Sequence, residues 1–354
     1  MREKHDQLDL HLTVAVEPQH KLDKYRAVCR RGADWLLRHM NADGSIGPAT
    51  DHLFYYRVPW TFALVGEIEA ATRVLEWIRR NMLTAEGAVE GIAAQGSFDE
   101  RYGSYPLACV VSGAVLMQRH DIARLCAHRL ETWQDPDSGG LFSRYDRRDA
   151  AGEQELFPTS QAGMSLLTAG AVDAARRAGE WMERLWELQP EPEHRLYSVY
   201  RPDQGLATEF DDDDKVMYVT EKDAPWQYHF NGGIGAAFLA HLYMATGEDR
   251  WLDLARLYQD FSMTTDECQF QSMQTCKSGW GSGLLYVATG EENYREWTVR
   301  MADWFCDNQY PDGHWENTKH WTPHPTLADN IHISTEFTMH MAHLISYLSV
   351  PAQT

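Results

Sequence analysis

The chain has 354 residues, of which 44% are hydrophobic and 24% charged, a composition that supports a large core and excludes disorder as the main state. Asp and Glu number 52 against 32 Lys and Arg, and the net charge of −20 excludes nucleic acid and anionic membrane surfaces as partners. No apolar run reaches the ~20 residues of a membrane span, the N-terminus is charged where a signal peptide is apolar, and the six cysteines form no CxxC motif. We therefore expect a soluble, cytoplasmic protein.

The first predicted elements are an N-terminal extension over residues 1–20 and an amphipathic helix near residues 22–40. Five segments then repeat one pattern: an apolar helix ends in small residues, a short break follows, and an amphipathic helix begins with acids and has a Trp near its end. Four of the breaks contain a glycine, at Gly66, Gly170, Gly247 and Gly290, whereas the segment 115–134 has none at its break. Glycine tolerates the left-handed conformation that ends a helix, so each segment is predicted to be a helical hairpin.

The two helices of each hairpin differ in their apolar pattern. The first helices are apolar nearly all round, as in residues 105–118 and 232–247, and belong inside; the second have one charged face and belong outside. A last inner helix near residues 331–348 complements the outer helix near 22–40. Because the two chain ends supply the halves of one hairpin, the sequence predicts an all-α fold, a closed (α/α)6 toroid over residues 1–354 as a single domain, in place of an open solenoid.

Turns rich in Asp, Gly and Pro follow several outer helices, at residues 41–48, 135–146 and 310–317. Two connections that lead to inner helices are long, at residues 135–157 and 188–227. Long connections in compact domains are more often functional than idle. We therefore expect the connection 188–227 to serve the function of the protein.

Short motifs in these turns resemble two families. Gln309, Gly313 and Trp315 match the QxxxGxW repeat of squalene–hopene cyclases, and residues 134–142 and 41–46 are degraded copies of it. The whole chain thus resembles the α/α toroid of terpene cyclases and protein prenyltransferase β subunits. The run 279–315 is also similar to six-hairpin carbohydrate enzymes, the unsaturated glucuronyl hydrolases and N-acylglucosamine 2-epimerases. Both resemblances imply a ligand site in the bowl where the inner helices begin.

An acidic run within the long connection is the first candidate for catalysis: Asp211, Asp212, Asp213 and Asp214. Adjacent carboxylates resist simultaneous ionisation, so burial would keep a proton on at least one of them. The run resembles the DxDD acid motif of class II terpene cyclases, although Lys215 follows it where that family has small or hydroxyl residues. The alternative is a solvated acidic loop.

A second candidate cluster precedes the fourth inner helix, with Trp226, Tyr228, His229 and Asn231 close together. The start of a helix at the mouth of a toroid directs side chains into the bowl, and His229 there would act as a base or hydrogen-bond donor. Asp51, before the first inner helix, would orient substrate or accept a proton. The alternative for the cluster is a capped helix start with core aromatics.

The starts of the other inner helices supply further candidate substrate-binding residues: Tyr55, Tyr56, Trp60, Tyr105, Cys276, Trp280, His332 and Glu336. An aromatic bowl stabilises a carbocation or stacks on a sugar, so its aromatic content does not choose between the two chemistries. His332, Glu336 and His340 form a stripe with i, i+4 spacing that could ligate a divalent ion. HExxH is absent and neighbouring groups often satisfy such histidines, so we expect no metal.

The signatures of nucleotide cofactors and of diphosphate binding are absent from the sequence, so we expect no cofactor. The leading hypothesis is an enzyme that cyclises, isomerises or dehydrates a small, mainly apolar terpenoid or polyketide-like molecule by acid–base chemistry. The alternatives are a carbohydrate hydrolase, lyase or epimerase, with Arg57, Gln161, Asn231 and Lys277 as sugar ligands, and a binding toroid without activity. The polarity of the bowl discriminates among them; the sequence leaves homo-oligomerisation open.

Overall fold

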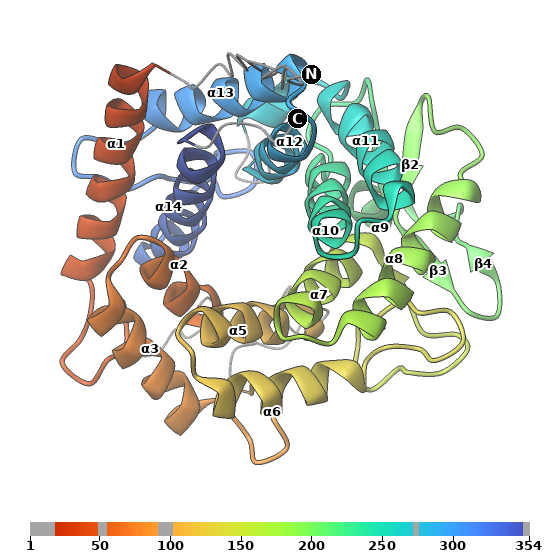
Figure 1. Cartoon of the computed structure of the whole chain (residues 1–354), viewed down its shortest axis with the longest axis horizontal. Coiled ribbons are helices and arrows are strands. Elements are labelled where there is room, and N and C mark those ends of the chain that lie inside the picture. Colours follow the sequence, from red (N-terminus) through yellow and green to blue (C-terminus); the bar gives the residue numbers. More distant parts are fainter. Residues whose placement is uncertain (1–17, 49–54, 91–101, 272–275, 350–354) are drawn as a thin grey trace, which may run out of the picture.

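The computed structural model describes residues 18–48, 55–90, 102–271 and 276–349, with the backbone alone for Asp213. Two concentric rings of helices surround a central axis (Figure 1). The described inner helices are α2 (Val58–Leu64), α5 (Ser104–Leu116), α7 (Leu156–Thr168), α10 (Phe230–Thr246), α12 (Cys276–Thr289) and α14 (Leu327–Ser349). The described outer helices are α1 (Gln19–Arg38), α3 (Ile68–Asn81), α6 (His120–Glu131), α8 (Val172–Glu187), α11 (Asp249–Met263) and α13 (Glu292–Asp307). The prediction of an all-α (α/α)6 toroid is confirmed.

The breaks inside the hairpins have the backbone conformation that the sequence predicts. Gly66, Gly170, Gly247 and Gly290 all have φ between 69° and 90°. In the hairpin without a glycine, Gln118 takes the same left-handed conformation, with φ 55°. An added Cβ at Gly66 or Gly170 would meet nothing within 4 Å. The glycines at these two breaks are therefore required for their backbone angle and not for lack of space.

The turns that follow α1, α3 and α6 each dock on the next outer helix through a glycine. A Cβ at Gly44, Gly87 or Gly139 would lie 2.3 to 2.7 Å from a backbone carbonyl oxygen of α3, α6 or α8, respectively. The turn after the last outer helix docks on the first helix in the same way, because a Cβ at Gly313 would lie 2.4 Å from the carbonyl oxygen of Arg31. The QxxxGxW motif therefore closes the ring.

Gln309 and Trp315, the two other residues of that motif, also stabilise the closed ring. The Gln309 side-chain amide donates hydrogen bonds to the carbonyl oxygens of Val28, on α1, and of Gly313, at 2.9 and 3.0 Å. Trp315 is buried, and its indole nitrogen donates to the carbonyl oxygen of Phe305 at 3.0 Å. α1 also packs against α14 and α13, so the chain ends complete one hairpin.

The long connection 188–227 lies outside the rings, beside α8 (Figure 1). It forms β2 (Arg195–Tyr197), β3 (Val199–Arg201), β4 (Gly205–Leu206), the short helix α9 (Asp212–Tyr218) and β5 (Val219–Glu221). β3 pairs with β4 and with β1 (Gln154–Glu155), and β2 pairs with β5, all antiparallel. The strands form two small sheets outside the rings, and the three-stranded sheet β1–β3–β4 joins the two long connections.

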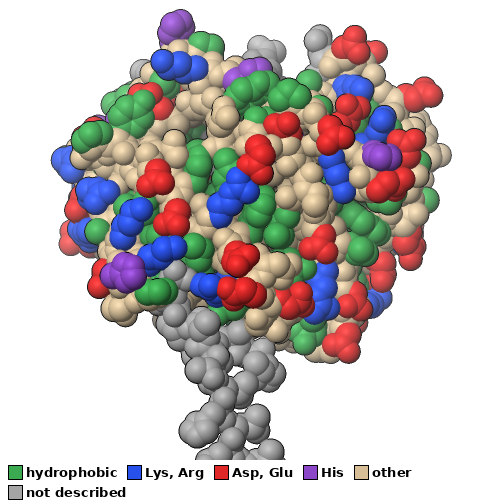
Figure 2. All heavy atoms as spheres, turned by 90° about the horizontal axis from the view of Figure 1, so that it is seen from above, with side chains coloured by type: hydrophobic (Ala, Val, Ile, Leu, Met, Phe, Trp, Pro, Cys, Tyr) green, Lys and Arg blue, Asp and Glu red, His purple; other side chains and the backbone are tan. Residues whose placement is uncertain are grey.

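The surface and the interior follow the charge pattern of the sequence. Acidic and basic side chains are interspersed over the face shown in Figure 2. The inner helices are buried nearly all round, and Gly233 brings α10 so close to α12 that a Cβ there would lie 2.4 Å from the Ser278 nitrogen. Among the described residues, no helix is both long and apolar enough to cross a membrane.

Candidate active site

A cavity of about 300 Å³ opens at the end of the toroid where the inner helices begin. Its wall combines residues in or directly before the six described inner helices with residues of the segment between α13 and α14. The described lining residues are Tyr56, Arg57, Tyr105, Phe157, Tyr228, Phe230, Lys277, Asn317, Trp321, Thr322, Asp329, His332, Ile333 and Glu336. Aromatic rings and charged groups thus face one cavity, which is the usual composition of a small-molecule site.

Glu336 is the centre of the charged part of this wall. Its side chain, on α14, is 1% exposed. Arg57, directly before α2, donates a hydrogen bond to one carboxylate oxygen at 3.1 Å. The ammonium of Lys277, at the start of α12, forms an ion pair with the other oxygen. Both cations are themselves buried. Three residues from three inner helices therefore form one buried network of charges.

The charge state of this network follows from its geometry. Burial favours the neutral form of Glu336, but the positive charges of Arg57 and Lys277 outweigh it and hold the pKa of the carboxyl well below its ordinary value. Burial alone would lower the pKa of Lys277, and the acidic groups Cys276 and Glu336 beside it raise it instead. Glu336 is thus ionised at neutral pH, between two cations.

Two histidines on α14 flank the carboxylate. His332 Nε2 lies 3.7 Å from one oxygen of Glu336, and His340 Nε2 lies 3.9 Å from the other. His332 lines the cavity, whereas His340 is fully buried behind it. Burial and a neighbouring positive charge, of Arg57 for His332 and of Lys277 for His340, hold both pKa values well below the ordinary one. Both imidazoles are therefore neutral at neutral pH. In this state one ring nitrogen of His332 can accept a proton.

Aromatic rings form the opposite part of the wall. Phe157 and Phe230, at the starts of α7 and α10, meet edge to face with centroids 5.3 Å apart, and Tyr105 packs against Phe157 at 5.6 Å. The hydroxyl of Tyr105 accepts a hydrogen bond from Arg57 at 3.3 Å, and burial raises its pKa to about 12. The aromatic wall is therefore apolar except where tyrosine hydroxyls meet the charged network.

Two segments meet at the mouth of the cavity. Trp226 stacks on His320, with ring centroids 4.3 Å apart and planes 9° from parallel, and Tyr228 packs against Trp321 at 5.6 Å. Trp226 holds a left-handed backbone conformation, φ 57°, which is strained for a bulky residue. Its backbone N–H donates to Cys268 Sγ at 3.1 Å. The ends of the connection 188–227 and of the segment after α13 are thus clamped together by aromatic contacts.

Of the residues predicted from the sequence to form the site, the cavity wall includes Tyr56, Tyr105, Tyr228, His332 and Glu336. It also includes Arg57 and Lys277, two of the four candidate sugar ligands. The other described ones lie in the surrounding structure. The Tyr55 hydroxyl binds the backbone of Ile46, and its ring stacks on Trp77. Trp60 and Trp280 pack against each other at 6.0 Å. Asn231 and His229 are buried outside the cavity wall, and Cys276 lies behind Glu336, at 3.6 Å from its carboxylate.

The structure does not bring the acidic run to the cavity. Asp211 directly precedes α9, Asp211 and Asp212 are exposed, and Asp214 is half-buried. None of these three, and no described residue of 188–227, lines the cavity; Tyr228, directly after it, does. The reason is the excursion of this connection to the outside of the rings. Asp51 lies outside the described residues.

Several lining residues were not predicted from the sequence. Phe157 and Phe230 lie in the first turns of inner helices, at positions equivalent to that of Tyr105. The helical repeat could therefore have predicted them as lining residues. Asn317, Trp321 and Thr322 come from a segment of irregular structure between α13 and α14, which has no periodic pattern to place it. Asn317 donates a hydrogen bond to Thr322 at 2.8 Å, so this segment is folded on itself at the cavity.

Comparison with known proteins shows the fold and leaves the chemistry open. No protein-family model and no curated protein matches the sequence. Among solved structures, a D-mannose isomerase is similar with a TM-score of 0.69 at 14% identity, over 93% of this chain and 99% of that one. The GH76A α-1,6-mannanase of Salegentibacter sp. HEL1_6 has a TM-score of 0.65 at 12% identity, over 91% and 99%. A type II terpene cyclase from Scytonema has 0.55 at 12% identity, over 93% and 98%.

The chain has the α/α-toroid fold. The predicted resemblance in fold, to terpene cyclases with six-hairpin carbohydrate enzymes as the competing group, is thereby confirmed. The three similar structures belong to different reaction classes, and at these identities their likeness to this chain shows the fold alone. The chemistry has to be argued from the cavity of this chain.

Proposed function

We propose that the cavity is the active site of an enzyme that moves a proton between the carbonyl carbon of a small polyhydroxy compound and the carbon next to it, as in the isomerisation of a sugar. One observation carries this proposal: the wall combines an ionised carboxylate, two buried cations and a neutral histidine beside an aromatic face. This combination suits a reaction in which a base removes a proton and negative charge develops on an oxygen.

In the proposed step, His332 Nε2 takes the proton from the carbon next to the carbonyl. The electrons of the broken C–H bond form a carbon–carbon double bond, and the carbonyl π electrons move to the oxygen. The carboxylate of Glu336, 3.7 Å from His332, stabilises the imidazolium, while Arg57 and Lys277 supply positive charge for the enediolate oxygen. The hydroxyl proton on the neighbouring oxygen passes to the enediolate oxygen, and the imidazolium returns its proton to the former carbonyl carbon. This completes the isomerisation and restores the histidine.

The remaining wall supports a sugar as the substrate. Aromatic rings such as Tyr228 and Trp321 offer faces for the apolar side of a sugar ring. Asn317, Thr322 and Asp329 add an amide, a hydroxyl and a carboxylate on the cavity wall, as hydrogen-bond partners for hydroxyl groups. A cavity of about 300 Å³ is at the small end of the range for ligand sites, which suits a single sugar unit.

The same geometry disfavours the two reactions that need a strong acid. A glycoside hydrolase requires a protonated carboxyl as the general acid, and Glu336, the buried carboxyl of the cavity wall, is held ionised by two cations. Cyclisation of a terpenoid also starts with a proton donor, and the aspartates predicted for that role are not part of the described cavity wall. The aromatic face is the observation that still favours a terpenoid, and the experiment below includes that substrate class.

The test is incubation of the protein in D2O with two panels, pentoses and hexoses in aldose and ketose form, and C10–C20 terpenoid alcohols and polyenes, followed by NMR. We expect deuterium at the carbon next to the carbonyl of one sugar, together with its isomer. His332→Asn and Glu336→Gln should each lower the rate at least 100-fold. Asp212→Asn, an exposed change on α9, is the matched control and should leave the rate unchanged.

Two outcomes would overturn the proposal. Exchange that persists in His332→Asn would remove the histidine from the proton transfer. Turnover of a terpenoid, lost in Asp214→Asn and without exchange into any sugar, would restore the cyclase hypothesis.

A further inference from the structure

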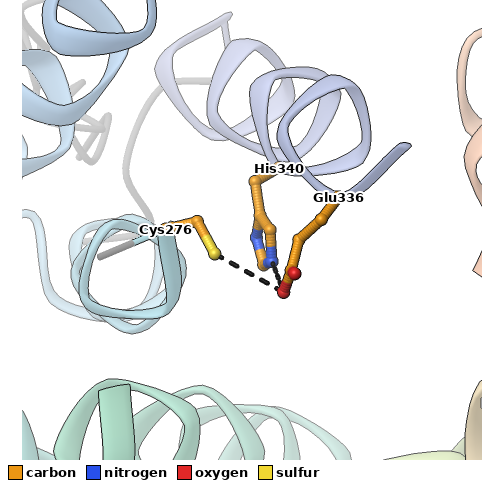
Figure 3. A group of neighbouring side chains, drawn as sticks. All are labelled: Cys276, Glu336 and His340. Carbon is orange, nitrogen blue, oxygen red and sulfur yellow. Dashed lines mark hydrogen bonds and ion pairs between the residues drawn. The ribbon is translucent and has the colours of Figure 1, made fainter. Parts of the chain in front are cut away.

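A cluster of three potential metal ligands lies where the start of α12 meets the middle of α14 (Figure 3). Cys276 projects from α12 toward Glu336 and His340, which project side by side from α14. The ligand atoms of the three residues all lie within 4.8 Å of one another, and all three side chains are buried. Thiol, carboxylate and imidazole are the groups that bind zinc in proteins.

The spacing of these atoms is close to that of a tetrahedral site. Zinc lies about 2.3 Å from a cysteine sulfur and about 2.0 to 2.2 Å from nitrogen or oxygen ligands, so its ligands are about 3.3 to 3.6 Å apart. Here Cys276 Sγ lies 3.6 Å from Glu336 Oε1, and His340 Nε2 lies 3.9 Å from the same oxygen. Small side-chain movements would therefore bring all three into coordination distance of one ion.

His340 supplies independent evidence for a ligand. Its side chain is fully buried, and neither ring nitrogen has a hydrogen-bond partner. Buried polar atoms are nearly always paired, because an unpaired one costs the free energy of its lost hydration. A ligand to Nε2 would remove part of that cost.

A cation already occupies this place in the structure. The Lys277 ammonium forms an ion pair with the same Glu336 oxygen and lies 3.7 Å from Cys276 Sγ. We propose that Cys276, Glu336 and His340 form a site for one thiophilic divalent cation, Zn²⁺ or Cd²⁺, and that Lys277 is its competitor within the chain. The ion binds when the ammonium moves aside, and the thiol proton passes to the solvent as sulfur coordinates.

The selectivity of the site follows from its donor atoms. Thiolate and imidazole favour Zn²⁺ and Cd²⁺ over Mg²⁺ and Ca²⁺, which prefer oxygen ligands. Because the ion would bind Glu336, which lines the cavity, it should also act as a reversible inhibitor of any activity that uses this carboxylate. The proposal itself concerns binding, and it stands or falls without reference to the reaction.

The experiment is titration of the full chain, freed of metal by a chelator, with Cd²⁺ and then Zn²⁺. We expect one Cd²⁺ per chain, with the ultraviolet absorption of a cadmium–thiolate bond, displaced by Zn²⁺ and unaffected by Mg²⁺. Cys276→Ser should abolish this absorption, and His340→Gln should weaken binding at least tenfold. Lys277→Met removes the competing ammonium and should strengthen binding at least tenfold.

The matched control is Cys268→Ser. Cys268 is a second buried cysteine beside a histidine, 3.7 Å from His229 Nε2, and it has no part in the cluster. Its substitution should leave the absorption and the affinity unchanged. Absorption that survives Cys276→Ser, absorption that disappears in Cys268→Ser, or an affinity that Lys277→Met does not raise would each overturn the proposal. Thermal melts establish that each variant is folded, and Lys277→Gln serves in place of Lys277→Met where that variant is not.

Discussion

Replacement of Glu336 by Gln tests whether the buried charge network holds the toroid together. The change keeps the shape of the side chain and removes the one carboxylate that contacts both Arg57 and Lys277. Removing one partner of a buried ion pair costs about 3 to 5 kcal/mol, because the remaining charge stays buried without compensation. With an unfolding entropy of about 2.1 cal/mol/K per residue over 354 residues, the melting temperature should fall by about 4 to 7 °C.

The assay is thermal unfolding followed by circular dichroism, together with Lys277→Met and the double variant. Lys277→Met leaves Glu336 paired with Arg57, so it should cost less than Glu336→Gln. The double variant leaves one buried cation where Glu336→Gln leaves two, so part of the lost stability should return. Asp212→Asn, an exposed change, should stay within about 0.5 kcal/mol of the unmodified protein.

A loss below about 1 kcal/mol for Glu336→Gln would refute this reasoning, because the two cations would then have no need of the carboxylate. A double variant less stable than Glu336→Gln would refute it as well. That result would show that Lys277 stabilises the fold by contacts other than its charge.

Three other predictions concern stability. Gly313→Ala places a Cβ 2.4 Å from the Arg31 carbonyl oxygen at φ 107°, so it should cost about 3 kcal/mol in denaturant unfolding, against about 1 kcal/mol for Gly66→Ala, where the space is open. Gln118→Gly should stabilise the protein by about 0.5 to 1 kcal/mol in the same assay, because the exposed Gln118 is left-handed; no gain would show that other contacts offset the strain. Burial, opposed by Asp266, lowers the pKa of His229 to about 4. The neutral histidine therefore contributes fully to the free energy of unfolding above pH 6.5, and this contribution is lost as the pH falls. Between pH 7.5 and 5 the loss is about 2 kcal/mol, and His229→Asn should remove it from the pH dependence of unfolding.

The repeat pattern of the sequence was sufficient to predict the rings because it is a local signal. Each break depends on the conformation of one residue, and Gln118 shows that the hairpin forms there even without a glycine. The closure of the ring could be predicted because the two chain ends have complementary patterns, and Gly313 docks on α1 as the other turn glycines dock on their neighbours. The bowl was predicted at the starts of the inner helices, where Tyr105 and His332 do lie in the cavity wall.

The partners in the charged network could not be predicted in the same way. Arg57 and Glu336 are 279 positions apart, and nothing in the local sequence pairs them. The acidic run attracts attention because of its composition, but the path of a long connection is set by packing that the sequence does not display. Here the connection pairs with β1 and extends outside the rings, so Asp211 and Asp212 are exposed to solvent.

The position of the site on the ring links its assembly to ring closure. Arg57 precedes the first inner helix, Lys277 begins the fifth, and Glu336 belongs to the last, so the network exists only when α14 lies between α2 and α12. Closure in turn depends on the turn around Gly313 that docks on α1. Ion pairing between cations and a carboxylate brought together from both ends of the chain therefore stabilises the closed ring, and the closed ring supplies the low-dielectric surroundings in which the network is strong.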